Sequence, residues 1–527
     1  MNAVPLTPRA PAATSHNVAR NSALYFVSLG VPAVAALFLV PVTVRALGPA
    51  RFGLLALAWA VAESTGIFDF GLGKATIRFV GDATVKGWER MREVIVASLL
   101  TQTAMGALAG ILLLLFAPVL VNRVFSIATA NRAEATAMFR VLALHMPVLL
   151  CIASMRASLE GAQRFDISTP LRIPSSLASV VVPAWAASAG YSLSAILWIL
   201  LVVRVVLAIL TIYAVKRVLI PSRWSLPSNW KVLREMLGYS GWVAVSTILG
   251  PVLGSFDRFT VGSVIGGTGL GYYSGASEGA NRVLLIPVTA FSAMLPALSA
   301  TDASDGRERS IAVTRAAQRQ LAALLFPVCV TILAFGPTIL GFWLGSSFAA
   351  AAGTALRILS IGIFLAGLAI LPLALLYGSG RPDLPAKINL IQVALHVPAT
   401  IILTRVLGIT GAALSVTLLR GEDLIFYEWA TRRAIGRGIA DDMERKRRAA
   451  LWTAAIILSV AFGLATWLQP DSGIAAASIG LIGLVVYAWW CWSRVFSPRE
   501  RKAWTGMLIR GSKIASLPEA VPTGVEP

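Results

Sequence analysis

Charged residues are scarce in this sequence: lysine, arginine, aspartate and glutamate make up 13% of its 527 residues, whereas hydrophobic residues make up 57%. Soluble globular domains carry about 25% charged residues, so this chain has too few water-facing side chains to cover a soluble fold of its length. Long apolar runs recur from one end of the chain to the other. This pattern is typical of a polytopic membrane protein.

Cysteine and histidine are also scarce, with three residues of each. They are far apart in the sequence: Cys151, Cys329 and Cys491, and His16, His145 and His396. Neither a disulfide framework nor the spacing of a metal site is recognisable in them. We therefore expect no bound metal and no organic cofactor.

Long hydrophilic loops are absent. Fourteen apolar stretches of roughly 20 residues, the length that crosses a bilayer, are expected to form helices. They lie at 21–44, 52–78, 93–118, 136–160, 168–189, 193–215, 234–257, 272–298, 317–343, 353–378, 384–404, 409–431, 450–468 and 473–493. A membrane glycosyltransferase, polymerase or peptidase would need a large loop carrying carboxylates or histidines. The sequence therefore favours a transporter over an enzyme.

The net charge of +20 could indicate a nucleic-acid partner, but the basic residues are dispersed among the loops. With the N-terminus inside, the segments on that side carry 27 of the 45 lysines and arginines, and those on the other side carry six. Cytoplasmic loops collect lysine and arginine by the positive-inside rule. We therefore expect both termini in the cytoplasm and no nucleic-acid partner.

An internal repeat divides the chain. A shift of 218 residues places Gly48 on Gly266 and Gly53 on Gly271, each pair within an outer hairpin. A parallel six-plus-six duplication is typical of carriers whose two lobes surround a central cavity and alternate its access. The expected parts are a tail (1–20), an N-terminal lobe (21–219), a linker (220–233), a C-terminal lobe (234–432), a basic loop (433–449), two further helices (450–493) and a tail (494–527).

Glycine pairs four residues apart occur in the second half of the chain. Gly250 with Gly254, and Gly275 with Gly279, would allow close contact between helices, but ordinary packing glycines are the favoured explanation.

A family resemblance rests on motifs in both halves of the chain. They are Leu47-Gly48, Phe52-Gly53, Asp69, Gly71, Gly73, Arg78, Asp257 and Gly271-Tyr272. Over residues 20–435 the chain resembles the Wzx-type polysaccharide flippases of the multidrug/oligosaccharidyl-lipid/polysaccharide exporter superfamily. The resemblance implies an inner-membrane protein that flips an oligosaccharide linked to undecaprenyl pyrophosphate. It also implies membrane lipids, a polysaccharide polymerase and the export machinery as partners.

Two alternatives lie in the same superfamily. Lipid II flippases carry charged residues in the first helix, whereas residues 21–44 of this chain have none. A cation-coupled exporter of small molecules would have a cavity dominated by acids, whereas lysine and arginine are at least as prominent here. A membrane enzyme of polysaccharide assembly is a third alternative, which the short loops disfavour.

Charged residues within the expected helices are the candidate site. Each costs on the order of 2.5–3.5 kcal/mol near the bilayer centre, so it should face a cavity or a partner. On one continuous helix at about 100° per residue, Glu63, Lys74 and Arg78 share a face and Asp69 points elsewhere. Glu278 is four residues from Arg282 and shares its face.

Different roles are expected for three sets of these residues. Four cations would line the cavity and bind pyrophosphate, because arginine suits phosphate oxygens: Lys74, Arg78, Arg258 and Arg282. Lys74 and Arg78 could instead extend to the cytoplasmic headgroups. Four acids would neutralise the cations or couple transport to H+ or Na+: Glu63, Asp69, Asp257 and Glu278. Three residues are candidates for intramembrane ion pairs: Arg204, Arg420 and Asp423.

Overall fold

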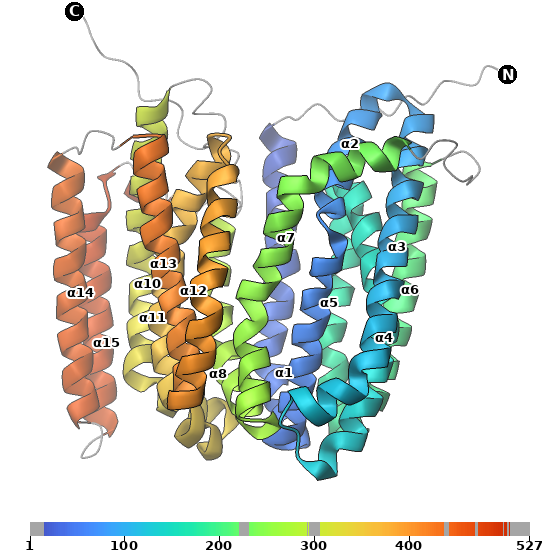
Figure 1. Cartoon of the computed structure of the whole chain (residues 1–527). Helices are drawn as coiled ribbons and strands as arrows, with labels where there is room; N and C mark the ends of the chain where they lie inside the picture. Colours follow the sequence, from blue (N-terminus) through green and yellow to red (C-terminus); the bar gives the residue numbers. More distant parts are fainter. Residues whose placement is uncertain are drawn as a thin grey trace, which may run out of the picture.

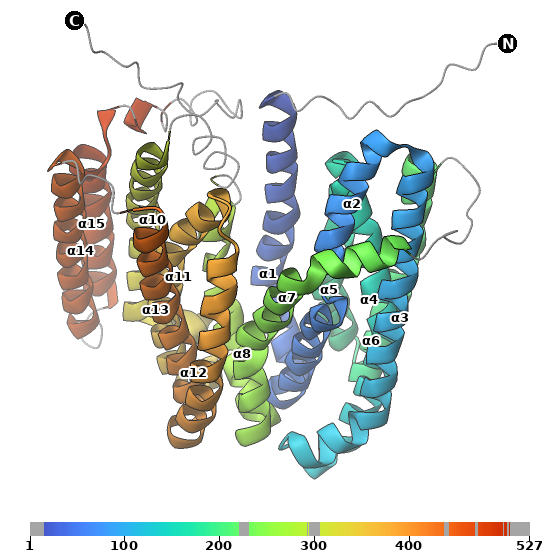
Figure 2. The same ribbon diagram turned by 45° about the horizontal axis from the view of Figure 1, so that its top comes forward.

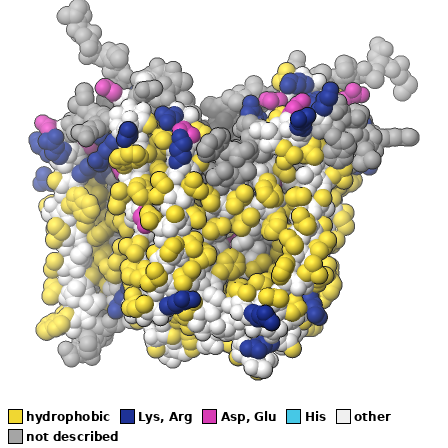
Figure 3. All heavy atoms as spheres, viewed as in Figure 1, with side chains coloured by type: hydrophobic (Ala, Val, Ile, Leu, Met, Phe, Trp, Pro, Cys, Tyr) yellow, Lys and Arg dark blue, Asp and Glu magenta, His cyan; other side chains and the backbone are white. Residues whose placement is uncertain are grey.

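The protein is a bundle of long helices (Figure 1). The computed structural model describes residues 15–220, 231–291, 294, 306–436, 442–468, 473–498, 500–502 and 505. Their regular secondary structure is entirely helical, which confirms the all-α membrane class. Hydrophobic side chains cover the middle of the molecule, and lysine and arginine side chains gather at its two ends (Figure 3).

The helices form two groups and an additional pair. The first group consists of α1 (Ser15–Glu63), η1 (Ser64–Asp69), α2 (Leu72–Lys86), α3 (Trp88–Val119), η2 (Leu120–Val124), α4 (Thr129–Gly161), α5 (Phe165–Ser188) and α6 (Leu193–Leu219). The second consists of α7 (Lys231–Val264), α8 (Gly267–Val283), α10 (Arg307–Leu344), α11 (Ser346–Gly378), α12 (Asp383–Leu407) and α13 (Ile409–Ala434). The additional pair is α14 (Asp442–Leu468) and α15 (Gly473–Trp490), which continues into η3 (Cys491–Val495).

Within the described residues, nine helices are long and apolar enough to cross a membrane. The count of fourteen spans therefore stays a prediction. The described chain begins and ends at the same end of the bundle (Figure 1).

The second expected helix, 52–78, is not continuous, so that prediction was wrong. After Glu63 the chain forms the 3-10 segment η1, and Phe70 and Gly71 then adopt left-handed conformations, with φ of 49° and 78°. The angular relation of an unbroken helix cannot be carried across this interruption. The expected common face of Glu63 with Lys74 and Arg78 is therefore lost.

Positive-φ residues recur at equivalent places in the two groups. The pairs are Gly48 and Gly266, Gly87 and Gly306, Gln163 and Gly380, and Gly190 and Gly408. Their separations are 218, 219, 217 and 218 residues. Left-handed backbone is costly for most residues, so four such coincidences in register support the parallel duplication.

The beginning of α7 packs on the first group of helices, although the sequence assigns it to the second. Val232 and Met236 are buried in a cluster with Met91 and Val94, and Arg90 forms an ion pair with Glu235. The helix then runs to the second group and ends beside α8 (Figure 2). It therefore connects the two groups physically as well as in sequence.

A buried arginine of α10 forms ion pairs and a hydrogen bond with the C-terminal part of the chain, next to an apolar cluster that α10 shares with α14 and α15. The side chain of Arg319 is 1% exposed, and its Nη2 lies 2.7 Å from a carboxylate oxygen of Glu500. Its Nε lies 3.4 Å from Glu444 on α14, and its Nη1 donates to the carbonyl oxygen of Val495 at 2.6 Å. Burial favours a neutral Glu500, but the Ser497 backbone N–H and Arg319 hold the pKa of Glu500 below its ordinary value.

We expect Arg319→Ala to destabilise the protein, because removing one partner of a buried ion pair costs about 3–5 kcal/mol. Thermal unfolding of the purified protein measures the loss. The matched control is Arg445→Ala on α14, whose side chain is 73% exposed in its pair with Asp442. Equal unfolding midpoints for the two variants would contradict an anchoring role for Arg319.

Candidate functional site

The two groups of helices meet through glycines at the end of the bundle opposite the described termini. A Cβ atom added to Gly53 of α1 would lie 2.0 Å from the carbonyl oxygen of Gly267. One added to Gly271 of α8 would lie 1.9 Å from the carbonyl oxygen of Pro49. No side chain fits at either position. The repeat glycines Gly53 and Gly271 thus face each other in a seam between the groups.

A second contact extends this seam. The backbone N–H of Ser126, which follows η2, donates to the carbonyl oxygen of Gly262 at 3.1 Å, and its hydroxyl donates to that of Ser263 at 2.6 Å. A Cβ atom on Gly266 would lie 2.4 Å from the carbonyl oxygen of Ser126. The two groups of helices are therefore also in backbone contact at the α7–α8 turn.

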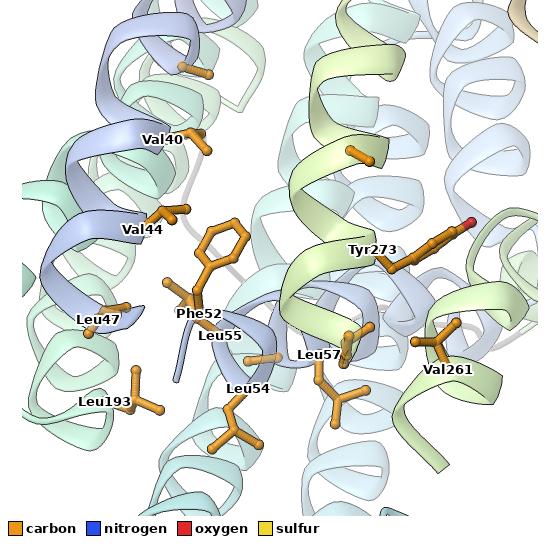
Figure 4. Close-up of a cluster of buried hydrophobic side chains, with 14 of the residues drawn as sticks. Val40, Val44, Leu47, Phe52, Leu54, Leu55, Leu57, Leu193, Val261 and Tyr273 are labelled. Carbon is orange, nitrogen blue, oxygen red and sulfur yellow. The ribbon is translucent and has the colours of Figure 1, made fainter. Parts of the chain in front are cut away.

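Hydrophobic side chains pack next to the seam (Figure 4). Phe52 and Leu57 follow the break of α1 at Gly48, and they share a buried cluster with Val261 of α7 and Tyr273 of α8. Removing this apolar surface from water favours the closed seam. The contact between the groups is thus stabilised in the conformation that the structure adopts.

A chain of four charged side chains lies beyond this cluster. Arg258 of α7 places Nη1 3.4 Å from Glu63 of α1 and Nη2 3.5 Å from Glu278 of α8. Glu278 also pairs with Arg282, one turn further along α8. The four formal charges cancel. Since Glu63 belongs to the first group and the others to the second, the chain bridges the two.

Exposure differs along this chain of charges. The side chain of Arg258 is 8% exposed and that of Glu278 is 14% exposed. Arg282 is 29% exposed, and Glu63 is 62% exposed. A ligand can therefore reach the two ends of the chain more easily than its middle.

Asp257 precedes Arg258 but points elsewhere. It is 6% exposed, and it accepts a hydrogen bond from the hydroxyl of Tyr273, which is fully buried. Its other carboxylate oxygen has no hydrogen-bond partner among the described residues. Asp257 is thus hydrogen-bonded inside the second group, and its charge also interacts with Arg258 and Glu63.

The remaining candidates of the second transmembrane segment lie apart from that chain. Lys74 and Arg78 are exposed on α2. Asp69 accepts from the backbone N–H of Gly73 with both carboxylate oxygens, at 3.1 and 3.0 Å. The N-cap of α2 is Gly71, so Asp69, two residues earlier, provides an acceptor for a backbone N–H of the first helical turn that has no partner within the helix.

Arg204 differs from the expectation of an intramembrane ion pair. It is 7% exposed, and its hydrogen-bond partners among the described residues are neutral: Nη1 lies 2.7 Å from Nδ1 of His145, and Nη2 lies 3.5 Å from the hydroxyl of Ser179. Arginine has no acceptor, so His145 accepts through Nδ1 and donates through Nε2 to the carbonyl oxygen of Leu197. The closest hydrogen-bond partner of this buried arginine is therefore a histidine rather than a carboxylate.

Arg420 and Asp423 lie together on α13, with 3.4 Å between Nη1 and Oδ2. Gln392 of α12 also donates to Asp423 at 2.9 Å. Sequence reasoning missed Gln392, because an uncharged residue in an apolar helix gives no electrostatic signal. The only sequence feature that could have identified Gln392 was its position as a polar residue within a predicted span.

The sequence matches a known protein family. Residues 42–353 match the family model described as polysaccharide biosynthesis protein. This match covers more than half of the chain. The protein belongs to that family.

Relatives of this family member extend the comparison. The chain is 25% identical over 421 residues to a Shigella flexneri protein named "Putative O-antigen transporter", covering 79% of this chain and 98% of the relative. Its fold is similar to the inward closed conformation of the lipid II flippase MurJ, with a TM-score of 0.71, 12% identity, and 89% and 98% of the two chains covered. A multidrug resistance MATE transporter in its inward-facing conformation has a TM-score of 0.64, 16% identity, and 77% and 97% coverage.

We expect Gly53→Ala to prevent the seam from closing, since its methyl group would overlap the backbone of Gly267. The readout is labelling of an Ala62→Cys variant by an impermeant maleimide added from the seam side, with the three native cysteines replaced by serine. Labelling should rise in Gly53→Ala.

The control is Gly30→Ala on the same helix, where a Cβ atom meets nothing within 4 Å. It should leave the cysteine as protected as in the parent. Equal protection in both glycine variants would show that the seam tolerates a side chain at Gly53.

Proposed function

We propose that the protein flips undecaprenyl-pyrophosphate-linked oligosaccharide units across the cytoplasmic membrane for surface polysaccharide assembly. The family match and the relative named as an O-antigen transporter support the pathway. The fold shared with a lipid II flippase and a MATE transporter supports a transporter that alternates its access rather than an enzyme. The observation that carries the proposal is the chain of charges between the two groups of helices, because its arginines suit a pyrophosphate.

Binding would proceed by exchange of anions. Arg258 and Arg282 each have a carboxylate partner in this structure. A pyrophosphate offers stronger, multiply charged acceptors, so it can replace a carboxylate without leaving an arginine unpaired. Glu63 is the partner that exchanges most easily, because it is the most exposed member and lies 3.4 Å from Arg258.

This exchange would also act on the seam. The pair of Glu63 with Arg258 joins α1 to α7, so its replacement by substrate removes a contact that holds the groups together. Opening of the seam would then expose the pyrophosphate to the periplasm. Substrate binding and alternating access are linked through one residue in this mechanism.

Glu63 is also the candidate for coupling to H+ or Na+. Asp69 is less suited, since both of its oxygens accept from Gly73. Protonation of Glu63 would release Arg258 for substrate. Lys74 and Arg78 on the exposed face of α2 remain candidates for guiding the pyrophosphate toward the site, or for contacting lipid headgroups.

The proposed orientation places both termini in the cytoplasm of an inner membrane, as the distribution of lysine and arginine favours. The seam then lies at the periplasmic end. A polysaccharide polymerase and the export machinery would receive the flipped unit on that side.

Deletion of the gene should make the lipid-linked saccharide accumulate in the cytoplasmic leaflet, where extraction and mass spectrometry of the lipid identify the sugar. Surface polysaccharide should fall at the same time. Normal surface polysaccharide and no accumulated lipid would contradict the proposed function.

We expect Arg282→Ala to reduce polysaccharide export about tenfold to a hundredfold at normal protein level, since a hydrogen bond to a charged group contributes about 1.5–3 kcal/mol. Complementation of the deletion strain measures export. The control is Arg405→Ala, which removes an exposed arginine near the end of α12. Wild-type export by Arg282→Ala would remove this residue from the site.

Glu63→Gln should make flipping independent of the coupling gradient, since glutamine cannot bind or release a proton. Flux in proteoliposomes, measured with and without imposed proton and sodium gradients, tests this. A gradient dependence that is the same in Glu63→Gln and the parent would assign coupling to another residue.

A further inference from the structure

A cavity of about 350 Å³ lies within the second group of helices, beside the charged chain. Its walls come from α7, from residues 284–288, and from α11, α12 and α13. Sites for small organic ligands have volumes of about 300–1,000 Å³, so this cavity is large enough for one small ring. The proposed pyrophosphate site does not account for it.

One wall of the cavity is polar. Five side chains on α12 and α13 form it: Asn389, Gln392, Arg420, Asp423 and Tyr427. They are joined by hydrogen bonds and an ion pair: Tyr427 donates to Asn389 at 3.3 Å, Gln392 donates to Asp423 at 2.9 Å, and Arg420 pairs with Asp423 at 3.4 Å. The opposite charges of Arg420 and Asp423 cancel. The wall thus offers donors and acceptors without a net charge.

Gln392 has an acceptor that the described residues leave unused. The residue is fully buried, and its Oε1 has no hydrogen-bond partner among them, although its Nε2 donates to Asp423. A buried polar group without a partner costs about 1–3 kcal/mol. A ligand that donates a hydrogen bond from within the cavity would remove that cost.

The opposite wall is widened by Gly250 and Gly254 of α7. These two glycines do not form the close helix contact that their spacing would allow, because a Cβ atom on either meets nothing within 4 Å among the described residues. Gly275 of α8, in contrast, would meet Leu344 at 2.7 Å. The missing side chains of Gly250 and Gly254 leave room in the cavity.

The cavity also lies at a suitable distance from the arginines. Gly254 is four residues before Arg258 on the same helix, a separation of about one turn or 5.4 Å along the axis. Leu284, on the same side of the cavity, is two residues after Arg282. A group attached directly to a pyrophosphate held by Arg258 and Arg282 would reach this space.

We propose that the cavity binds one neutral sugar ring of the lipid-linked oligosaccharide, the ring next to the pyrophosphate. The inference rests on the proposed function and deepens it. Sugar hydroxyls both donate and accept hydrogen bonds, which matches the amides, the carboxylate and the guanidinium of the wall. A bound cation fits poorly, because Arg420 already neutralises Asp423. The cavity would thus contribute to the choice of saccharide.

The experiment compares three probes on the purified full-length protein: undecaprenyl pyrophosphate without sugar, and the same carrier bearing one glucose or one N-acetylglucosamine. Native mass spectrometry gives the dissociation constant of each. The wild type should bind at least one of the glycosylated carriers tenfold or more tightly than the bare carrier.

Gly254→Leu should reduce this ratio to about one while leaving affinity for the bare carrier unchanged, because leucine fills the cavity without removing a charge. Gln392→Leu, which removes the unused acceptor, should also lower the ratio of affinities for the glycosylated and bare carriers. The control is Gly463→Leu on the exposed face of α14, where a Cβ atom also meets nothing within 4 Å. It should keep the full ratio.

Equal affinities of the wild type for all three carriers would overturn the inference, and so would a ratio that survives Gly254→Leu. Either result leaves binding of the bare carrier, and therefore the proposed function, intact. Failure of the wild type to bind the bare carrier would instead overturn the proposed function together with the sugar site.

Discussion

The ion pairs of Arg258 are the interaction on which the site depends. An arginine that is 8% exposed within an apolar bundle needs a counter-charge or hydrogen-bond acceptors, and here Glu63 and Glu278 provide two counter-charges from different groups of helices. This requirement brings α1, α7 and α8 together at one depth. Gly53 and Gly271 allow the backbones to approach closely enough for the pairing to form.

Neutrality of the charged chain has a consequence for transport. A cavity with unpaired cations would hold a pyrophosphate too firmly to release it, whereas one with internal acids returns to a paired state when the substrate leaves. The same balance recurs in the cavity of the second group, where Arg420 and Asp423 are paired. Recognition of the phosphates and of the sugar would then depend on exchange of partners in both places.

Hydropathy and charge were sufficient to predict much of the fold. Apolar runs predicted the helical membrane class, and Gly48 with Gly266 predicted the duplication that the paired positive-φ residues support. Hydropathy did not predict the interruption between Glu63 and Leu72, because an average over a whole span hides the local turn signals Asp69 and Gly71 that flank the left-handed Phe70. An unbroken helix through this segment would place Glu63 on one face with Lys74 and Arg78, which the structure separates.

The sequence by itself determined which chemical groups enter the membrane, because their number and spacing along the chain do not depend on folding. It determined that Glu278 and Arg282 are neighbours, since one helical turn separates them. Only the tertiary structure decided that Arg258 joins them to Glu63, 195 residues away, and that Gly250 and Gly254 face a cavity. Contacts between helices depend on rotation and depth, which packing of the whole bundle sets and no local pattern encodes.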